Sequence, residues 1–326
     1  MATIDPPRSQ STRESEVTRL RSESFMHRLR HRWHAARTLL CVGLDGQLDQ
    51  MPEPFTGARE AAKAHAPSAD QRIYDALFDF HKAIVDATAD LVCCYKPNIA
   101  FFEEHGPTGL RALVALIAWI QQTYPEIPVL LDAKRGDIGS TSEAYARAIF
   151  DVYGADAVTA QPYLGRDAIA PLLDRAERGV FVLCRTSNPG SGELQERTGP
   201  DGEPLYMHVA RQVAESWNTN GNCGLVVGAT YPQELGAVRE AVGDMPILVP
   251  GIGAQGGDLE AVLSHGLDSK HTGLLISVSR NVLYASSGRD YASAARRETA
   301  RLRNEIERLR RGPESSGTHK APPAGK

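Results

Sequence analysis

The chain has 326 residues, of which 42% are hydrophobic, and a formal net charge of -4. This length allows one large domain or two ordinary ones, and the net charge gives no indication of a nucleic-acid partner. The best candidate for a membrane span, Ala112 to Ile120, is far too short. The five cysteines lack metal-binding spacing, and Cys93 and Cys94 lie in an apolar run, where we expect buried thiols, as suits a reducing cytoplasm.

Residues 1–24 are polar and lack periodicity, so we expect a disordered arm there. A short helix from about Ser24 to Ala36 is predicted to follow, in a stretch rich in arginine and histidine. A transit peptide is the alternative interpretation of the arm. Acidic residues such as Glu14 and Glu16 oppose it, because transit peptides contain few acids.

From Thr38 onward, apolar runs of strand length alternate with stretches of helical periodicity. The expected strands are Leu39–Leu44, Leu91–Tyr95, Val129–Leu131, Ala157–Thr159, Val180–Cys184, Leu225–Val227, Ile247–Val249 and Leu274–Val278. Clear helical patterns between them are Tyr74–Ala87, Leu110–Gln122 and Tyr206–Trp217. This alternation implies a parallel sheet of the α/β class, and eight repeats in roughly 250 residues predict a single (β/α)8 TIM barrel. A doubly wound open sheet is the alternative fold.

The barrel domain is predicted to span residues 25–311. Residues 51–72 are rich in Pro, Ala and Gly and indicate an insertion after the first strand. The last helix, about Tyr291 to Arg311, carries Arg and Glu at i,i+4 spacing and is expected to be solvated on one face. Residues 312–326, with Pro, Gly and Ser, are expected to form a disordered tail.

Charged residues cluster behind the first three expected strands. Asp132, Lys134 and Asp137 follow strand three, and the spacing of the first two places their side chains on one face. Asp45 follows strand one and Lys96 follows strand two. Because barrel active sites lie where strands end, we expect four of these charges to converge as an alternating, self-compensating array. An ordinary charged loop is the alternative.

Two other chemistries fit this cluster less well. Carboxylates bind Mg²⁺, but interleaved lysines compete for the same oxygens, and no histidine pair has metal spacing, so we predict no metal site. No Ser or Cys has an adjacent His base in a motif context, which argues against nucleophilic catalysis.

A glycine-rich stretch follows strand seven. Gly251, Gly253 and Gly256 match a dinucleotide-binding pattern, but they lie late in the chain and no acid ends the next strand. Loops after strands seven and eight form the usual phosphate site of such barrels. Glycine N–H groups, the positive end of the following helix and Arg280 after strand eight therefore predict a phosphomonoester ligand. The alternative is a glycine-rich turn with a structural arginine.

The stretch from Arg185 to Glu193 is long, polar and glycine-rich. A mobile lid over a site and an ordinary surface loop both have this composition, and this stretch alone does not decide between them.

Together these residues resemble the orotidine 5′-phosphate decarboxylase family, most closely its bacterial second subfamily. The matching stretches, in order, are Leu-Cys-Val-Gly-Leu-Asp at 40–45, Tyr-Lys-Pro-Asn-Ile-Ala-Phe-Phe-Glu at 95–103, Leu-Asp-Ala-Lys-Arg-Gly-Asp-Ile-Gly at 131–139, Pro-Tyr-Leu-Gly-Arg-Asp at 162–167, Leu-Cys-Arg-Thr-Ser-Asn-Pro-Gly at 183–190, Val-Gly-Ala-Thr-Tyr-Pro at 227–232 and Pro-Gly-Ile-Gly-Ala-Gln-Gly-Gly-Asp at 250–258. The strand-three motif is specific only in combination with the others.

The resemblance implies a homodimer that converts orotidine 5′-phosphate to UMP in de novo pyrimidine biosynthesis, without cofactor or metal. By position, Asp45 and Lys96 would hold ribose hydroxyls and the charge array. Asp132 would lie against the substrate carboxylate. Lys134 would protonate the carbon that loses CO₂, with Lys96 as the alternative donor.

The resemblance also assigns roles to five further residues by position. Asp137 and Thr141 would reach into the partner's site, and Ser187 would contact the pyrimidine. Gln255 and Arg280 would hold the phosphate. The sequence departs from the expected pattern at Gly46 and Gln47, where Pro-Asp is expected, at Gln161, where Asn is expected, and at Ser277-Val278-Ser279. None of these departures removes a charge of the implied mechanism.

Two other functions fit parts of this pattern. A sugar-phosphate lyase or decarboxylase of similar barrel also carries Asp-x-Lys-x-x-Asp but uses Mg²⁺; Lys96 and the loop at 186–192 favour the nucleotide enzyme. A non-catalytic phosphate-binding barrel, acting on RNA through its arginine-rich arm, is the other rival. It would have no need for carboxylates that repel its ligand.

Overall fold

The computed structural model describes residues 19–20, 22–64, 69–253 and 257–311. Its strands form one parallel sheet in the order β2-β1-β8-β7-β6-β5-β4-β3. They are β1 (Leu40–Gly43), β2 (Cys94–Lys96), β3 (Leu130–Arg135), β4 (Ala157–Ala160), β5 (Gly179–Arg185), β6 (Cys223–Val227), β7 (Ile247–Pro250) and β8 (Leu274–Val278). Bridges Tyr95–Val129 and Asn98–Asp132 join β2 to β3, so the sheet closes into the predicted barrel and the open-sheet alternative is wrong.

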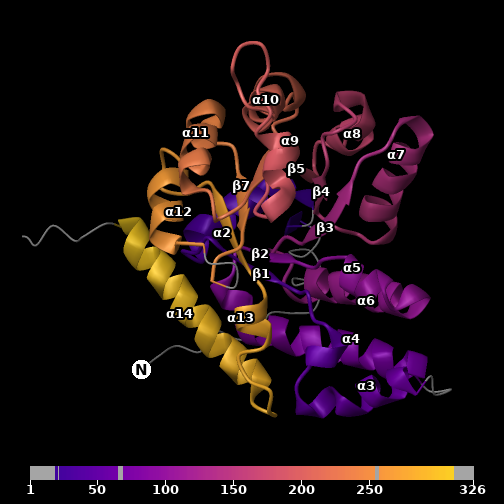
Figure 1. Ribbon diagram of the computed structural model, residues 1–326. Coiled ribbons are helices and arrows are strands. Elements are labelled where there is room, and N and C mark those ends of the chain that lie inside the picture. The colour runs from indigo at the N-terminus through magenta and orange to yellow at the C-terminus, as the bar shows by residue number, and fades with distance from the viewer. Residues whose placement is uncertain (1–18, 21, 65–68, 254–256, 312–326) are drawn as a thin grey trace, which may run out of the picture.

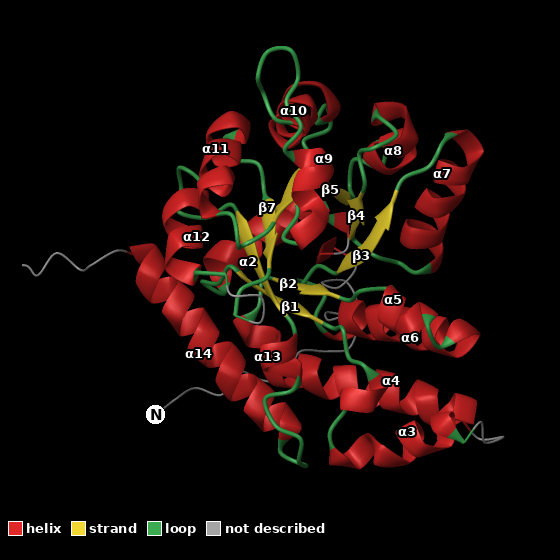
Figure 2. Cartoon of the chain, in the orientation of Figure 1, coloured by secondary structure: helices red, strands yellow, loops and turns green. Residues whose placement is uncertain are grey.

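Helices cover the outside of the strands and one end of the barrel (Figure 1; Figure 2). They are α2 (Phe25–Ala35), α3 (Thr56–Lys63), α4 (Ala69–Thr88), α5 (Ala100–Glu103), α6 (Gly106–Thr123), α7 (Gly139–Arg147), α8 (Arg166–Leu173), α9 (Gly192–Gln195), α10 (Leu205–Gln212), α11 (Pro232–Val242), α12 (Leu259–Gly266), α13 (Arg280–Leu283) and α14 (Tyr291–Arg311). The predicted helices lie within α4, α6 and α10, where a π-helical turn, Val213–Trp217, extends α10. No helix among the described residues is both long enough and apolar enough to cross a membrane.

Most strand residues are apolar because both faces of the strands are buried over most of their length. Every residue of β1, β4, β6 and β8 is buried, with helices outside and the packed barrel interior inside. Such strands appear in a sequence as short continuous apolar runs, which is why all eight were recognisable without a structure.

The second strand begins later than predicted. Ala89–Leu91 is a 3₁₀ turn, and β2 starts only at Cys94. Side chains rather than a neighbouring strand satisfy the carbonyls here: Arg32 donates to Val92 O at 2.6 Å, and Thr38 Oγ1 donates to Leu91 O at 2.9 Å. Lys96 is consequently the last residue of the strand, not the residue after it.

Helix α2 belongs to the folded domain and closes the barrel at the end where strands begin. Phe25 packs edge-on against Phe181 of β5, with ring centroids 5.7 Å apart. Arg28 forms a buried ion pair with Asp156, directly before β4. Because Arg28 and Arg32 are buried, these arginines do not form an exposed RNA-binding face.

The predicted arm, insertion and tail are only partly described. Residues 1–18 and 312–326 lie outside the described residues, as do 65–68 of the insertion. The described part of the insertion contains α3, which packs on α4. Its Glu53 pairs with Arg289 at 3.0 Å, linking the segment after β1 to the one after β8.

Candidate active site

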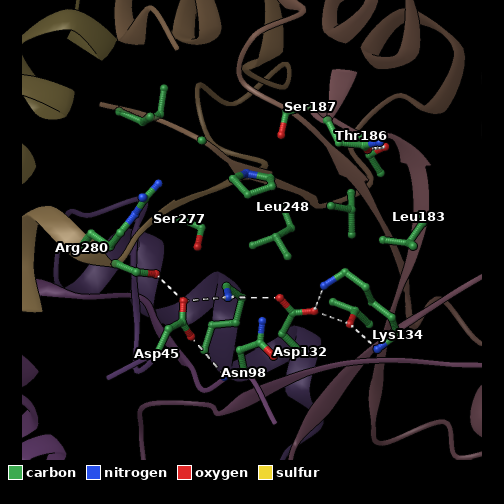
Figure 3. A pocket seen from close by; sticks show the side chains of 18 of the residues that line it. Asp45, Asn98, Asp132, Lys134, Leu183, Thr186, Ser187, Leu248, Ser277 and Arg280 are labelled. Carbon is green, nitrogen blue, oxygen red and sulfur yellow. Dashed lines mark hydrogen bonds and ion pairs between the residues drawn. The ribbon is translucent and has the colours of Figure 1, made fainter. Parts of the chain in front are cut away.

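A cavity of about 680 Å³ lies at the carboxyl ends of the strands (Figure 3). Every strand, or the loop directly after it, contributes to its wall. In strand order these residues include Asp45, Lys96, Asp132, Lys134, Thr159, Leu183, Val226, Leu248 and Ser277. The predicted charges and an apolar wall of aliphatic side chains therefore face one enclosed space.

The four expected charges form one alternating row across this cavity. Lys134 Nζ lies 2.6 Å from Asp132 Oδ1, and Lys96 Nζ lies 3.3 Å from Asp132 Oδ2. On its other side Lys96 Nζ is 3.8 Å from Asp45 Oδ2. The order Lys134–Asp132–Lys96–Asp45 confirms the predicted convergence, and each buried charge has an opposite neighbour.

The electrostatics of the row keep its inner members ionised. Burial alone would lower the pKa of Lys96, but the carboxylates of Asp45 and Asp132 outweigh it and raise that pKa above its ordinary value. Burial alone would raise the pKa of Asp132, yet the two ammoniums, with a hydrogen bond from Thr159, lower it to about 2. At neutral pH Asp132 is therefore a carboxylate.

Backbone and hydroxyl donors fix the end of the row at Asp45. Its Oδ1 accepts the backbone N–H of Asn98 at 3.1 Å, and its Oδ2 accepts the hydroxyl of Ser279 at 2.6 Å. Asp45 thus receives donors from the loops after β2 and β8. Both donors hold its carboxylate toward Lys96 and the cavity.

The strand-three motif lies inside its strand rather than behind it. β3 continues to Arg135, so Asp132 and Lys134 are strand residues. The pairing of β3 with β4 shifts between Leu131 and Arg135, and Lys134 has a left-handed backbone with φ 48°. This bulge gives Lys134 its orientation toward Asp132.

The polar loop after β5 lies over the cavity. Ser187 lines the cavity as predicted, together with Thr186 and Asn188. The loop is tied to α9, since Thr186 N donates to Gln195 Oε1 at 2.9 Å. Arg185 anchors its base: the guanidinium is buried, bonds Glu196 and stacks 3.8 Å from the ring centroid of Tyr231.

Gly251, after β7, and Arg280, after β8, also line the cavity. Arg280 points into the space across the row from Lys134 (Figure 3), and it forms no ion pair with any residue that the structure describes. Gln255, predicted to hold phosphate, lies outside the described residues.

The helix that follows the glycine-rich stretch has a capped N-terminus. Asp258 caps α12 and accepts the N–H groups of Glu260 and Ala261. A carboxylate that occupies these donors repels a second anion. Arg280 and the glycine backbone remain the candidate anion donors.

Asp137 and Thr141 lie outside the cavity lining of their own chain. Asp137 Oδ1 accepts the N–H of Ile138 at 2.7 Å, and Thr141 is exposed on the first turns of α7. The structure therefore does not bring these two predicted site residues to the row of charges within one chain.

Several lining residues had not been predicted. They are Gln47, Asn98, Thr159, Gln195, Ser277, Ser279 and Tyr284, with Thr186 and Asn188 from the loop after β5. Thr159 is the last residue but one of β4 and Ser279 directly follows β8, so a polar residue near a strand end was the available signal. Neither the described part of the lining nor any other described part of the chain gathers three or more His, Cys, Asp or Glu side chains in a metal-binding group.

A buried histidine supports the turn after Asp45. The N–H of Gly46 donates to His81 Nε2 at 3.0 Å, while His81 Nδ1 donates to Leu77 O at 2.6 Å. A Cβ at position 46 would lie 2.7 Å from His81 Nε2, so this contact requires glycine. The sequence thus has glycine where proline is expected, and the contact of Gly46 with His81 is the structural counterpart of this departure.

His81 makes stability depend on pH. Burial lowers its pKa from 6.5 to about 4, against the hydrogen bond to Leu77 and the charge of Asp45. As pH falls, this histidine takes up a proton in the unfolded chain before it does so in the folded protein. The stabilisation that the neutral, buried His81 gives to the folded state is therefore complete above about pH 6.5 and is lost as pH falls toward 4. Between pH 7.5 and 4.5 we expect the free energy of unfolding of wild type to fall by on the order of 3 kcal/mol more than that of His81→Gln. Urea unfolding at both pH values checks this, and equal losses in the two proteins would refute it.

Comparison with known proteins places these observations in a family context. A family model described as Orotidine 5′-phosphate decarboxylase / HUMPS family matches residues 38–296. The chain is 48% identical over 271 residues to an orotidine 5′-phosphate decarboxylase from Janthinobacterium sp. (strain Marseille), which covers 82% of this chain and 92% of that protein.

Solved structures show the same similarity. The OMP decarboxylase of Leishmania donovani has 37% sequence identity and a TM-score of 0.73, over 89% of this chain and 100% of that one. The UMP synthase of Leishmania donovani has 40% identity and a TM-score of 0.75, over 89% of this chain but 57% of that one. This chain therefore spans little more than half of the UMP synthase chain.

Proposed function

The chain belongs to the orotidine 5′-phosphate decarboxylase / HUMPS family, and from this premise we propose that it decarboxylates orotidine 5′-phosphate to UMP in pyrimidine biosynthesis, with Lys134 as proton donor. The observation that carries the proposal is the row Lys134–Asp132–Lys96–Asp45 at the cavity mouth. The row offers a fixed negative charge directly beside a proton donor, which is what expulsion of CO₂ without an electron sink requires.

Asp132 supplies the destabilising charge. It remains ionised at neutral pH, so a substrate carboxylate bound against it is repelled. The bond between ring carbon and carboxyl group breaks, its electron pair stays on the ring carbon, and CO₂ leaves. That carbon then takes a proton from Lys134 Nζ, which becomes a neutral amine. Before that, the ammonium stabilises the developing negative charge.

The exposure of the two lysines supports Lys134 as the donor. The Lys134 side chain is 50% exposed and extends into the cavity, whereas Lys96 is 6% exposed and is held between two carboxylates. Giving up a proton from Lys96 would leave Asp45 and Asp132 without the cation between them. We assign Lys96 to charge compensation and, with Asp45, to the ribose hydroxyls.

Binding energy from the far end of the substrate drives the carboxylate against Asp132. Arg280 lies across the cavity from Lys134 and is the proposed phosphate ligand, with Gln255 and the Gly251 backbone. Ser187, on the loop after β5, is the proposed pyrimidine contact. Phosphate contacts remote from the reacting carbon can be used in this way to offset ground-state repulsion.

The decisive experiment is UV-monitored loss of orotidine 5′-phosphate with purified protein, with and without EDTA. We expect full activity in EDTA, because the lysines occupy the carboxylate oxygens that a metal ion would need. Activity that vanishes with EDTA and returns with Mg²⁺ would instead indicate a metal-dependent sugar-phosphate enzyme of the same barrel type. No loss of orotidine 5′-phosphate under either condition would refute the function.

Replacing Arg280 tests the phosphate assignment. We expect Arg280→Ala to raise KM and to lower kcat/KM for orotidine 5′-phosphate by about 10²-fold or more. Orotidine, which lacks the phosphate, should be turned over by the variant nearly as well as by wild type. Steady-state kinetics on both substrates check this. Equal losses on the two substrates would mean that Arg280 is structural.

We also propose that two chains assemble into a homodimer with shared sites. Ile138 is 64% exposed and Tyr163 76% exposed, and they follow β3 and β4 on the side of the barrel that carries Asp137. Large exposed apolar side chains at neighbouring loops favour a protein partner. Such an interface would let Asp137 and Thr141 reach the partner's cavity. The five buried free thiols support a cytoplasmic location.

A further inference from the structure

Thr159, the third residue of β4, touches the charge row through a single buried oxygen. Its side chain is 1% exposed, and its Oγ1 donates to Asp132 Oδ1 at 2.8 Å. The same oxygen accepts the backbone N–H of Ala133 at 3.1 Å and of Lys134 at 3.0 Å. A hydroxyl has one proton and two lone pairs, so the three contacts use its full capacity.

Those two N–H groups lie in the bulge of β3. The register between β3 and β4 shifts between Leu131 and Arg135, so the backbone ladder skips Ala133 and Lys134. Lys134 is one of three described non-glycine residues with positive φ. A left-handed lysine is strained and persists only where its surroundings hold it. Thr159 supplies the missing backbone partners at that point.

We propose that Thr159 is a positioning residue that sets the relation between Asp132 and Lys134. Its hydroxyl orients the carboxylate directly and the lysine through its backbone, so one atom fixes both the repelling charge and the proton donor. The inference rests on the proposed function, because it concerns the geometry of that reaction. Thr159 itself is assigned no contact with the substrate.

Thr159→Val keeps the shape of the side chain and removes all three hydrogen bonds. We expect it to lower kcat for orotidine 5′-phosphate by about 10- to 10²-fold, the range for losing a hydrogen bond to a charged group. KM should change by less than about threefold, because the ribose and phosphate contacts lie on other strands. Thr159→Ser keeps the hydroxyl and should restore kcat to within about threefold of wild type.

Thr38→Val is the matched control for a general loss of packing or stability. Thr38 is equally buried, and its hydroxyl donates to Leu91 O and accepts from Leu40 N, at the end of the barrel remote from the cavity. It should lower the free energy of unfolding as Thr159→Val does, yet leave kcat unchanged. Should Thr159→Val not fold, Thr159→Cys replaces it as the partner of Thr159→Ser, since a thiol bonds weakly.

Three outcomes overturn the inference while wild type is active. They are an unchanged kcat in Thr159→Val, a Thr159→Ser enzyme as slow as Thr159→Val, and a Thr38→Val enzyme that loses kcat to the same degree. A wild-type protein that does not consume orotidine 5′-phosphate instead refutes the proposed function, so the two failures are distinguishable.

Discussion

Replacing Lys134 with alanine is expected to lower kcat by far more than about 10³-fold. The substitution removes the ammonium that stabilises charge on the ring carbon and the proton that quenches it, and each effect alone contributes on the order of 10² or more. It also leaves Asp132 with Lys96 as its single cationic neighbour in the row.

The folded state should survive this substitution. Lys134 is half exposed at the cavity mouth, and Asp132 keeps its contacts to Lys96 and Thr159. Lys96→Ala is different, because it would leave two buried carboxylates, Asp45 and Asp132, without the cation between them. Breaking a buried pair in this way costs about 3–5 kcal/mol, so that variant should be both inactive and unstable.

Kinetics and chemical unfolding of three variants separate these roles. Lys270→Ala is the control, because Lys270 is an exposed lysine that pairs with Asp244 on the surface at 3.8 Å. It should match wild type in kcat and nearly in stability. A Lys134→Ala enzyme that is stable and turns over at close to the normal rate would transfer the donor role to Lys96.

Much of the fold could be predicted because its strands are buried on both faces. β8 was found at its predicted bounds, Leu274–Val278, since four of its five residues are apolar and polar residues follow it. The start of β2 was predicted too early, because Leu91 and Val92 are apolar and buried without being part of a strand. Their carbonyls are held by Arg32 and Thr38, contacts that no local pattern indicates.

The charges of the site could be predicted, but the geometry that orients them could not. Asp132 and Lys134 follow one buried run, and strand periodicity places them on one face. The bulge at Lys134 depends on the register between β3 and β4, and its partner Thr159 lies 25 residues further along the chain. His81 similarly reaches Gly46 across 35 residues.

The second large effect concerns the proposed dimer. If Asp137 acts in the neighbouring subunit's site, two nearly inactive variants should restore activity when mixed. A two-fold interface is reciprocal, so each chain would contribute its own Asp137 to the partner's site and receive the partner's Asp137 in return. Lys134→Ala and Asp137→Ala are mixed under conditions where subunits exchange. In a mixed dimer one site carries both defects, and the other combines an intact Lys134 from one chain with an intact Asp137 from its partner.

Random pairing makes half of the dimers mixed, so about a quarter of all sites should regain activity. The matched control is a mixture of Lys134→Ala with Asp132→Asn. Asp132 and Lys134 contact each other within one chain, at 2.6 Å, so no mixed dimer of these two variants contains an intact site.

Recovery in the first mixture and none in the second would locate Asp137 across the interface. A first mixture no more active than its components, with exchange shown by mass spectrometry of the mixed species, would put Asp137 in the same subunit as Lys134. The loop that carries Asp137 would then have to fold back over its own cavity to reach the row of charges. The exposure of Ile138 and Tyr163 would no longer be explained by a shared active site.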